Sequence, residues 1–255
     1  MGEVFDLLEV KYQLYNTQRF IATDPVSIPH RYHRKEDIEI SGLLTALISW
    51  GTRKAILNSA NRLMNYLENE PFNFVTTASV KEFNRFNHFV YRTFNSDDLL
   101  FMIYALRAVY LEMGGLEDVA LSAFNRGGTI KSVISGLRNA LLKTEHLRRS
   151  EKHLANPENG SAAKRINMFL RWMVREDKSN VDFGIWKQIP TSALMCPLDI
   201  HSGNVARKLG LLSRKQNDWK AVEELTDNLR KFDKNDPVKY DFALFGMGVF
   251  EGWGK

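Results

Sequence analysis

A lysine and an aspartate, Lys164 and Asp199, each stand at the mouth of a predicted amphipathic helix. A neutral lysine amine is a nucleophile, and a nearby carboxylate can take up a proton or stabilise positive charge on the atom attacked. The two residues lie 35 positions apart, so only the folded chain can bring them together. Each also has an ordinary structural interpretation, which must be weighed against the chemical one.

The aspartate belongs to the stretch PLDIHSGNVARKLGL, residues 197–211. Aspartate is a favoured N-cap because its carboxylate accepts hydrogen bonds from the first amides of a helix. Val205 and Leu209 mark an apolar face of that helix, and Gly210 favours its end. Spacing alone therefore favours a capping role for Asp199, which is compatible with a catalytic one.

The lysine follows the polar turn Asn159-Gly160-Ser161, which is predicted to open directly into a helix from Ser161. The amides of Gly160, Ser161 and Ala162 would then point outward at a helix N-terminus, where backbone amides and the helix dipole favour a phosphate. Lys164 lies next to Arg165 at the edge of the buried stripe of this helix. On spacing alone, a surface lysine with a packed alkyl stem is the favoured interpretation.

The elements that must position these residues are almost all helices. Apolar residues recur at helical spacing along most of the chain, whereas alternating strand patterns and hairpin signals are scarce. The sequence therefore predicts an all-α protein, with loops over 22–37, 150–160 and 177–197. The predicted helices cover residues 39–50, 54–70, 95–115, 129–147, 161–177, 200–209, 218–233 and 239–250.

Composition limits the remaining possibilities. The formal net charge is +5, which favours a polyanionic partner. Cys196 is the only cysteine, so an internal disulfide and a cysteine-ligated zinc or iron–sulfur site are excluded. His30 and His33 have no carboxylate at a metal-binding spacing, and we expect neither a metal nor another cofactor. The start lacks an apolar signal core and no apolar run is long enough to span a bilayer, so we expect a cytoplasmic, nucleoid-associated protein.

An ordered set of segments resembles the helix-hairpin-helix DNA glycosylase superfamily. GSAAKRINMFL (160–170) is similar to its hairpin and second helix, and PLDIHSGNVARKLGL to its segment with an essential aspartate. LLTALISWGTRKAILNSANRL (43–63) resembles an early helix of the family, and VEELTDNLRKFD with KYDFALFGMG its last helices. The similarity spans roughly 38–250. As a whole the chain also resembles a bacterial family of unknown function (DUF2400-like) and the archaeal-type 8-oxoguanine DNA glycosylases.

The resemblance implies a two-lobed glycosylase-like fold over residues 1–255. One lobe would be the middle of the chain, 38–152, and the other would combine 1–37 with 153–255. The resemblance also implies that Lys164 and Asp199 are the catalytic residues, supported by His201. Because both residues begin helices after irregular loops, we predict that they face one cleft between the lobes. No metal and no iron–sulfur cluster would be bound. Phosphates of double-stranded DNA would contact Gly160, Ser161, Ala162, Arg165, Arg207 and Lys208.

A damaged base must leave the stack before its glycosidic bond is cut, and it would need a pocket of aromatic and apolar faces. The candidates for this pocket are Trp50, Met168, Phe169 and Phe245, with Asp241 as a polar contact. Each is also a plausible core residue, which spacing favours. Residues 164–215 carry ten basic and four acidic side chains, an excess that fits DNA but also an ordinary solvated face.

The function expected from the resemblance is base excision repair. The chain would be a DNA glycosylase with AP-lyase activity, a hydrolase that removes an oxidised purine such as 8-oxoguanine. Two alternatives stay open from the sequence. One is a non-catalytic nucleic-acid-binding protein with the same fold, which would bind DNA without releasing a base. The other is a helical interaction module with an incidental basic surface, which would bind DNA weakly with little dependence on salt.

Overall fold

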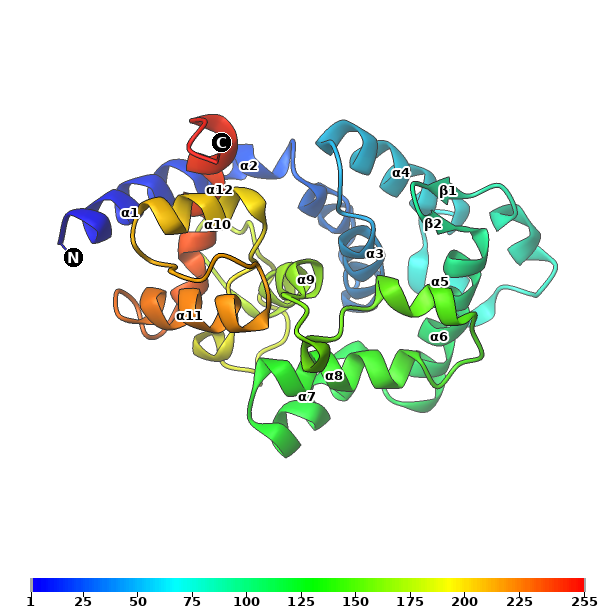
Figure 1. Cartoon of the computed structure of the whole chain (residues 1–255). Helices are drawn as coiled ribbons and strands as arrows, with labels where there is room; N and C mark the ends of the chain where they lie inside the picture. Colours follow the sequence, from blue (N-terminus) through cyan, green and yellow to red (C-terminus); the bar gives the residue numbers. More distant parts are fainter. Residues whose placement is uncertain (1, 255) are drawn as a thin grey trace. The chain divides into compact units, whose positions relative to one another are not determined.

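The computed structural model describes residues 2–254 and confirms the prediction of an all-α protein (Figure 1). Short 3-10 turns connect several of its helices. The α-helices are α1 (Gly2–Tyr15), α2 (Gln18–Ile21), α3 (Lys35–Leu47), α4 (Arg53–Tyr66), α5 (Pro71–Thr77), α6 (Ser96–Glu112), α7 (Leu116–Gly127), α8 (Ile130–Leu141), α9 (Lys164–Val174), α10 (Ile200–Lys208), α11 (Trp219–Arg230) and α12 (Asp241–Phe250). The strands β1 (Val90–Tyr91) and β2 (Phe94–Asn95) form an antiparallel hairpin in which Tyr91 pairs with Phe94.

Most predicted helices exist, with shifted ends. The helix predicted to run to residue 70 ends at Tyr66, because Glu68 and Asn69 both take positive φ angles. The helix predicted from Ser161 begins only at Lys164, because Ala163 has φ +48° and stands outside the helical region. The helices α1, α2, α5 and α7 were not predicted from the sequence.

The chain forms two compact units. Unit 1 comprises the chain up to Ala22 and the chain from Pro157 onward, and unit 2 comprises Thr23–Asn156. The expected middle lobe, 38–152, lies inside unit 2, but that unit begins earlier than expected. The reason is that the short turns Pro25–Ser27 and Pro29–Arg31 bury apolar side chains and pack on α3 and α4.

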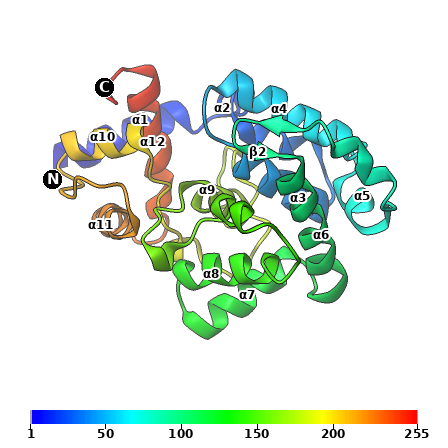
Figure 2. The same cartoon turned by 45° about the vertical axis from the view of Figure 1, so that its right-hand side comes forward.

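Unit 2 is built around α3, whose residues from Ile38 to Leu47 are all buried. Within it α7 and α8 lie side by side in both views (Figure 2). Gly136 of α8 makes this close approach possible, because a Cβ there would lie only 2.4 Å from the Cβ of Ala123. Small residues at a helix crossing therefore determine how α7 and α8 pack.

A buried carboxylate ties α6 to the 3-10 turn Arg148–His153 of unit 2. Asp98 shares a capping box with Asn95 at the start of α6, and its side chain has almost no exposed surface. Its Oδ1 accepts a hydrogen bond of 2.6 Å from the Ser150 hydroxyl, and its Oδ2 lies 3.1 Å from Nε2 of His153. Burial acts to raise the pKa of Asp98, but these hydrogen bonds and nearby cations hold it below its ordinary value.

Unit 1 is organised around α12, which packs on both α1 and α10. Gly246 faces the ring of Tyr15 on α1, where a Cβ would lie 2.1 Å from a ring carbon. Gly248 faces His201 on α10, where a Cβ would lie 3.0 Å from the His201 Cβ. The two glycines thus let the apolar helix α12 fit closely against two neighbours, one of which carries Asp199 at its start.

Across residues 2–254 we find no individual helix with both the length and the apolar character needed to cross a bilayer. The pair α6 and α7 satisfies those two criteria only when taken together, and the two helices are bent by 74° at their junction.

We predict that Asp98→Asn lowers the free energy of unfolding by roughly 2–4 kcal/mol. Ser150 and His153 each contact a different oxygen of the carboxylate, whereas the asparagine side chain has only one oxygen that can accept a hydrogen bond. Since the folded-state pKa of Asp98 is lowered, its contribution is present above about pH 4 and is lost as the pH falls further. Urea unfolding measures both effects. The control is Asp97→Asn at the exposed neighbouring position, and equal losses in the two variants would contradict the prediction.

Candidate functional site

The structure brings Lys164 and Asp199 together within unit 1. The Lys164 Nζ lies 3.6 Å from Oδ2 of Asp199, where α9 and α10 begin. The side chains are 29% and 23% exposed, so the pair is partly desolvated but still reachable from solvent. An amine and a carboxylate that are distant in sequence are therefore neighbours at a surface.

Asp199 also caps α10, as its spacing predicted. Its Oδ1 accepts hydrogen bonds from the amide of Ser202 at 2.9 Å and from the Ser202 hydroxyl at 3.2 Å, and the Ser202 hydroxyl accepts one from the Asp199 amide. Asn217 donates a 2.9 Å hydrogen bond to the Asp199 carbonyl. The cap therefore uses Oδ1, whereas the lysine faces Oδ2, so the two contacts involve different oxygens of one carboxylate.

The turn before α9 is shaped by residues that precede Lys164. Ser161 Oγ accepts a 3.2 Å hydrogen bond from the Ala163 amide, and Asn167 donates a 3.1 Å hydrogen bond from its side chain to the Ala162 carbonyl. Asn167 is buried one turn into α9, so it connects the turn to the helix. This bracing places Lys164, rather than Ser161, in the first helical position.

The expected set of outward-pointing amides at Gly160–Ala162 needs correction. The Gly160 amide donates to the Pro157 carbonyl at 3.0 Å, and the Gly160 carbonyl accepts from the Trp219 amide at 3.0 Å. Ser161 is paired with Asp218 in an isolated antiparallel bridge. The first amides of α9 are instead those of residues 164–166, because the helix begins three residues later than predicted.

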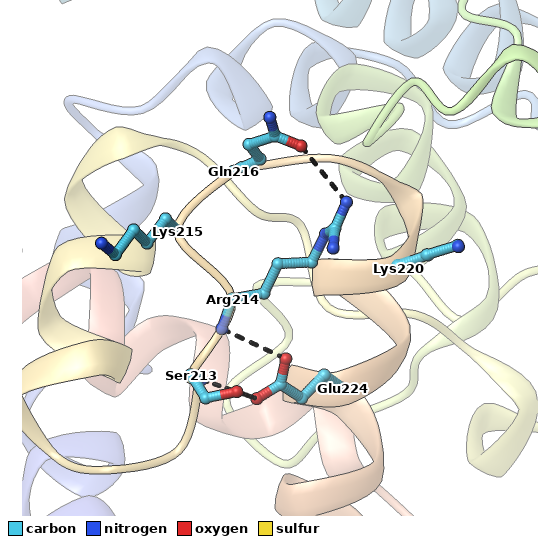
Figure 3. A pocket seen from close by; sticks show the side chains of 6 residues that line it. All are labelled: Ser213, Arg214, Lys215, Gln216, Lys220 and Glu224. Carbon is cyan, nitrogen blue, oxygen red and sulfur yellow. Dashed lines mark hydrogen bonds between the residues drawn. The ribbon is translucent and has the colours of Figure 1, made fainter.

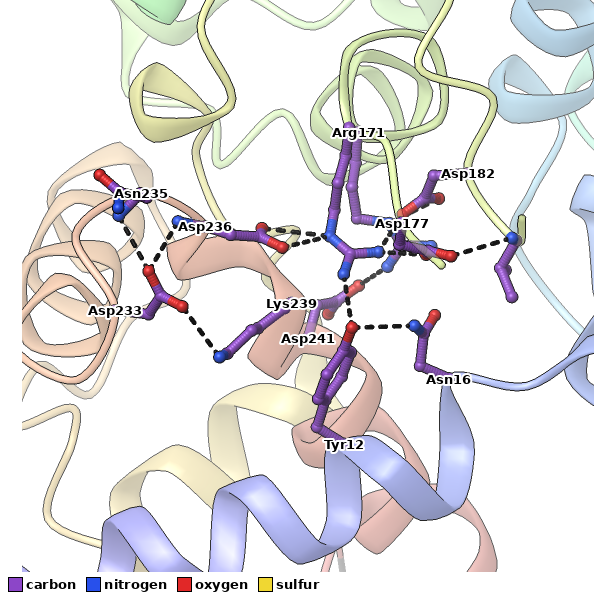
Figure 4. Close-up of polar contacts among 12 residues, drawn as sticks. Tyr12, Asn16, Arg171, Asp177, Asp182, Asp233, Asn235, Asp236, Lys239 and Asp241 are labelled. Carbon is purple, nitrogen blue, oxygen red and sulfur yellow. Dashed lines mark hydrogen bonds and ion pairs between the residues drawn. The ribbon is translucent and has the colours of Figure 1, made fainter. Parts of the chain in front are cut away.

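A network of buried charges fixes the other end of α9, and no sequence pattern predicted it (Figure 4). Arg171 pairs with Asp182 at 3.2 Å and with Asp241 of α12. Arg175, which has no exposed surface, pairs with Asp182 at 2.9 Å and with Asp236 at 2.9 Å. Arg175 also pairs with Asp177 at 2.5 Å and donates to the Tyr12 hydroxyl of α1 at 3.0 Å.

The expected base-pocket residues of unit 1 do not form one apolar surface. Phe169 is fully buried with its ring 5.6 Å from that of Trp186, so it is a core residue and not a face open to a base. Met168 is buried, and Phe245 is half-buried with its ring 6.2 Å from Phe20. Asp241 is buried against Arg171, so its carboxylate already has a partner.

Trp50 belongs to unit 2, where its half-buried ring lies 5.3 Å from Tyr91 and 6.2 Å from His153. The Tyr91 hydroxyl donates a 2.5 Å hydrogen bond to the Trp50 carbonyl. These contacts hold the Trp50 ring in place after the end of α3, and Gly51, with φ +107°, lets the chain turn there.

The remaining predicted residues have distinct environments. Arg165 is half-buried, and burial lowers its pKa to about 10. Arg207 donates to the carbonyls of Arg214 and Lys215 at 2.8 and 3.0 Å, so it holds a loop rather than extending freely into solvent. Lys208 and His201 are exposed.

Within the described residues, no group of three or more histidine, cysteine, aspartate or glutamate side chains is arranged to hold a metal ion. The Cys196 thiol is buried, and burial raises its pKa well above the ordinary value. The site therefore presents an amine and a carboxylate as its reactive groups.

The family model described as "Protein of unknown function (DUF2400)" matches residues 24–250. The chain belongs to this family, which agrees with the resemblance seen in the sequence. No curated protein and no solved structure matched the chain.

The buried carboxyl group of Asp241 leads to a prediction of how the stability of the protein depends on pH. Burial raises its pKa to about 6, and the charge of Arg171 only partly opposes this effect. Since the folded-state pKa lies above the unfolded value of about 3.9, the folded protein binds the proton more tightly, and stability falls as the pH rises from about 4 through 6. Between pH 4 and pH 7, we expect the free energy of unfolding of the wild type to fall by roughly 2–3 kcal/mol relative to that of Asp241→Asn.

Urea unfolding across this pH range measures that difference. Asp227→Asn is the matched control, because Asp227 is an exposed aspartate of α11 in the same unit. For the control, the difference in unfolding free energy from wild type should not depend on pH. The same result for Asp241→Asn would show that Asp241 is ionised across the whole pH range and would contradict the prediction.

Proposed function

We propose that this protein is a DNA glycosylase with AP-lyase activity that removes an oxidised purine, such as 8-oxoguanine, from double-stranded DNA. The observation that carries the proposal is the 3.6 Å approach of the Lys164 amine to the Asp199 carboxylate. The resemblance of the segments around both residues to helix-hairpin-helix glycosylases supports the assignment of DNA as the substrate. In this role the protein would act in base excision repair on the bacterial nucleoid in the cytoplasm.

The proposed reaction begins with the lysine. The Lys164 ammonium gives up a proton, and the neutral amine attacks the C1′ carbon of the damaged nucleotide while the N-glycosidic bond breaks. The bonding electrons leave with the base, which takes up a proton. Asp199 Oδ2 faces the amine and stabilises the positive charge that develops on the sugar.

The intermediate accounts for the lyase activity. Loss of the sugar ring oxygen bond to C1′, with protonation of that oxygen, gives a Schiff base between Lys164 and C1′. A proton is then removed from C2′, and the 3′ phosphate leaves with the electrons of its C–O bond. Water finally hydrolyses the Schiff base and frees the lysine.

The position of the pair suits this chemistry. Asp199 is held by its hydrogen bonds to Ser202, and Asn217 holds the backbone at the same residue. Lys164 is held by the braced turn before α9 and by the buried charges at the end of that helix. A preorganised carboxylate stabilises a transition state without the cost of reorienting at the moment of reaction.

We predict that Lys164→Gln abolishes the covalent adduct that borohydride traps between the protein and a lesion-containing duplex. Glutamine keeps much of the length of the side chain but has no nucleophilic amine, so DNA affinity should change little. A panel of duplexes with different oxidised bases, scored for base release, strand nicking and trapping, makes the measurement.

Lys178→Gln is the matched control, because it makes the same charge change at an exposed lysine just beyond the end of α9. Undiminished trapping in Lys164→Gln would show that another amine acts or that the assignment is wrong. A wild-type protein that binds DNA but processes no lesion in the panel would favour a non-catalytic binding protein.

We predict that Asp199→Asn slows base release by about 10²–10³-fold, because the charge that stabilises the sugar cation is removed. Asparagine is also a good N-cap, so α10 should fold and the far-UV circular dichroism and duplex affinity should be retained. Single-turnover kinetics measure the rate. An unaltered rate would exclude Asp199 from the reaction, and Asp227→Asn should leave the rate at the wild-type value.

A further inference from the structure

A basic pocket lies in unit 1 (Figure 3). It has a volume of about 580 Å³ and is formed by the loop between α10 and α11 and by the first turns of α11. Its lining residues are Ser213, Arg214, Lys215, Gln216, Lys220 and Glu224. The Trp219 amide donates to the Gly160 carbonyl, and Asp218 pairs with Ser161, so pocket and turn are joined through the backbone.

The loop that forms the pocket is held in shape from two sides. Arg207 of α10 donates to the carbonyls of Arg214 and Lys215 and, at 2.5 Å, to the side-chain oxygen of Asn217. Glu224 of α11 accepts from the amide and the hydroxyl of Ser213, each at 2.6 Å. The backbone of the pocket is therefore set before any ligand arrives.

The acidic side chains of this region are occupied by internal partners. Both oxygens of Glu224 accept hydrogen bonds from the backbone of the loop. Asp218 forms two hydrogen bonds with the Arg214 guanidinium and caps α11 by accepting from the Ala221 amide. The pair with Arg214 is the main reason that the pKa of Asp218 falls to about 2.

The lysines of the pocket differ from the acids. Lys215 and Lys220 are exposed, and neither has an ion-pair partner among residues 2–254. Figure 3 shows the two side chains extending away from the loop in opposite directions, with the Arg214 side chain between them. Charges that diverge in this way are suited to separate phosphates along a backbone rather than to one small anion.

We propose that this pocket binds the sugar–phosphate backbone of DNA, with Lys215 and Lys220 contacting different phosphates of one duplex. The inference rests on the proposed function for the identity of the ligand. It places the phosphate contacts on lysine side chains beside the turn at Gly160–Ala162, where the Gly160 amide already donates to the Pro157 carbonyl. It also gives Arg207 a positioning role, since that side chain holds the loop that carries Lys215.

The test is the salt dependence of binding to an undamaged duplex, measured by fluorescence anisotropy between about 50 and 200 mM salt. Each neutralised phosphate contributes about −0.9 to the slope of log affinity against log salt. The double variant Lys215→Gln/Lys220→Gln should therefore bind with a slope about 1.8 smaller in magnitude than wild type.

Lys231→Gln/Lys234→Gln is the matched control, because it removes two exposed lysines from unit 1 just after α11 and away from the pocket loop. Its slope should equal that of wild type. A slope that changes equally in both double variants, or in neither, overturns the proposal. Displacement of DNA by low millimolar inorganic phosphate at constant ionic strength would also overturn it, because the pocket would then bind isolated phosphate.

The result separates this inference from the glycosylase assignment. If the wild type forms the trapped adduct but Lys215→Gln/Lys220→Gln leaves the salt slope unchanged, the glycosylase assignment stands and the pocket proposal is wrong. If the double variant shows the smaller slope but the wild type processes no lesion, the pocket proposal stands and the glycosylase assignment is wrong. Absence of any duplex binding overturns both.

Discussion

The buried arginines of α9 are the interaction on which unit 1 depends. Arg171 lies in the last turn of α9 and Arg175 caps its C-terminal end, and the two reach aspartates from the following loop, from the segment before α12 and from α12 itself. Removing one partner of such a buried group typically costs 3–5 kcal/mol, because the other charge is left without compensation. Burial alone would lower the pKa of Arg175, but the surrounding carboxylates, Asp182 foremost, raise it overall.

This network has direct consequences for the candidate site. It fixes the axis of α9, and thereby the place of Lys164 at the opposite end of the helix. The network also contains more carboxylates than arginines, so part of its buried negative charge has no compensating cation and is unfavourable. Burial accordingly raises the pKa of both Asp236 and Asp241. The charges of Asp199 and Lys164 act on Asp241 as well, which means that this pair and the structural network are electrostatically coupled.

Unit 2 follows the same principle with different residues. A single buried carboxylate, Asp98, collects hydrogen bonds from Asn95, Ser150 and His153 and so holds the start of α6 to a segment more than fifty residues away. In both units, then, helices with ordinary apolar faces are joined by a few buried polar contacts. Apolar packing allows many helix arrangements of similar energy, whereas buried polar groups must find their partners, so they favour one arrangement.

The sequence by itself determined the class of fold and most of the helices, and it singled out Lys164 and Asp199 as candidate site residues. Helical periodicity and capping residues such as Asn95, Thr129, Asp199 and Asp218 are local signals, and all four residues cap helices in the structure. The resemblance of ordered segments led to Lys164 and Asp199 as a pair and to the family to which the chain belongs. These features depend on neighbours in sequence or on motifs that can be read along the chain.

Only the tertiary structure decided how those residues meet. The 3.6 Å approach of Lys164 to Asp199, the late start of α9 and the tie between Arg171 and Asp241 all join segments that are distant in sequence or depend on a backbone angle at one alanine. The same is true of Phe169, whose spacing fits a pocket equally well but whose surroundings bury it completely. Periodicity gives the face on which a side chain lies, but the partner on that face is set by the packing of the whole unit.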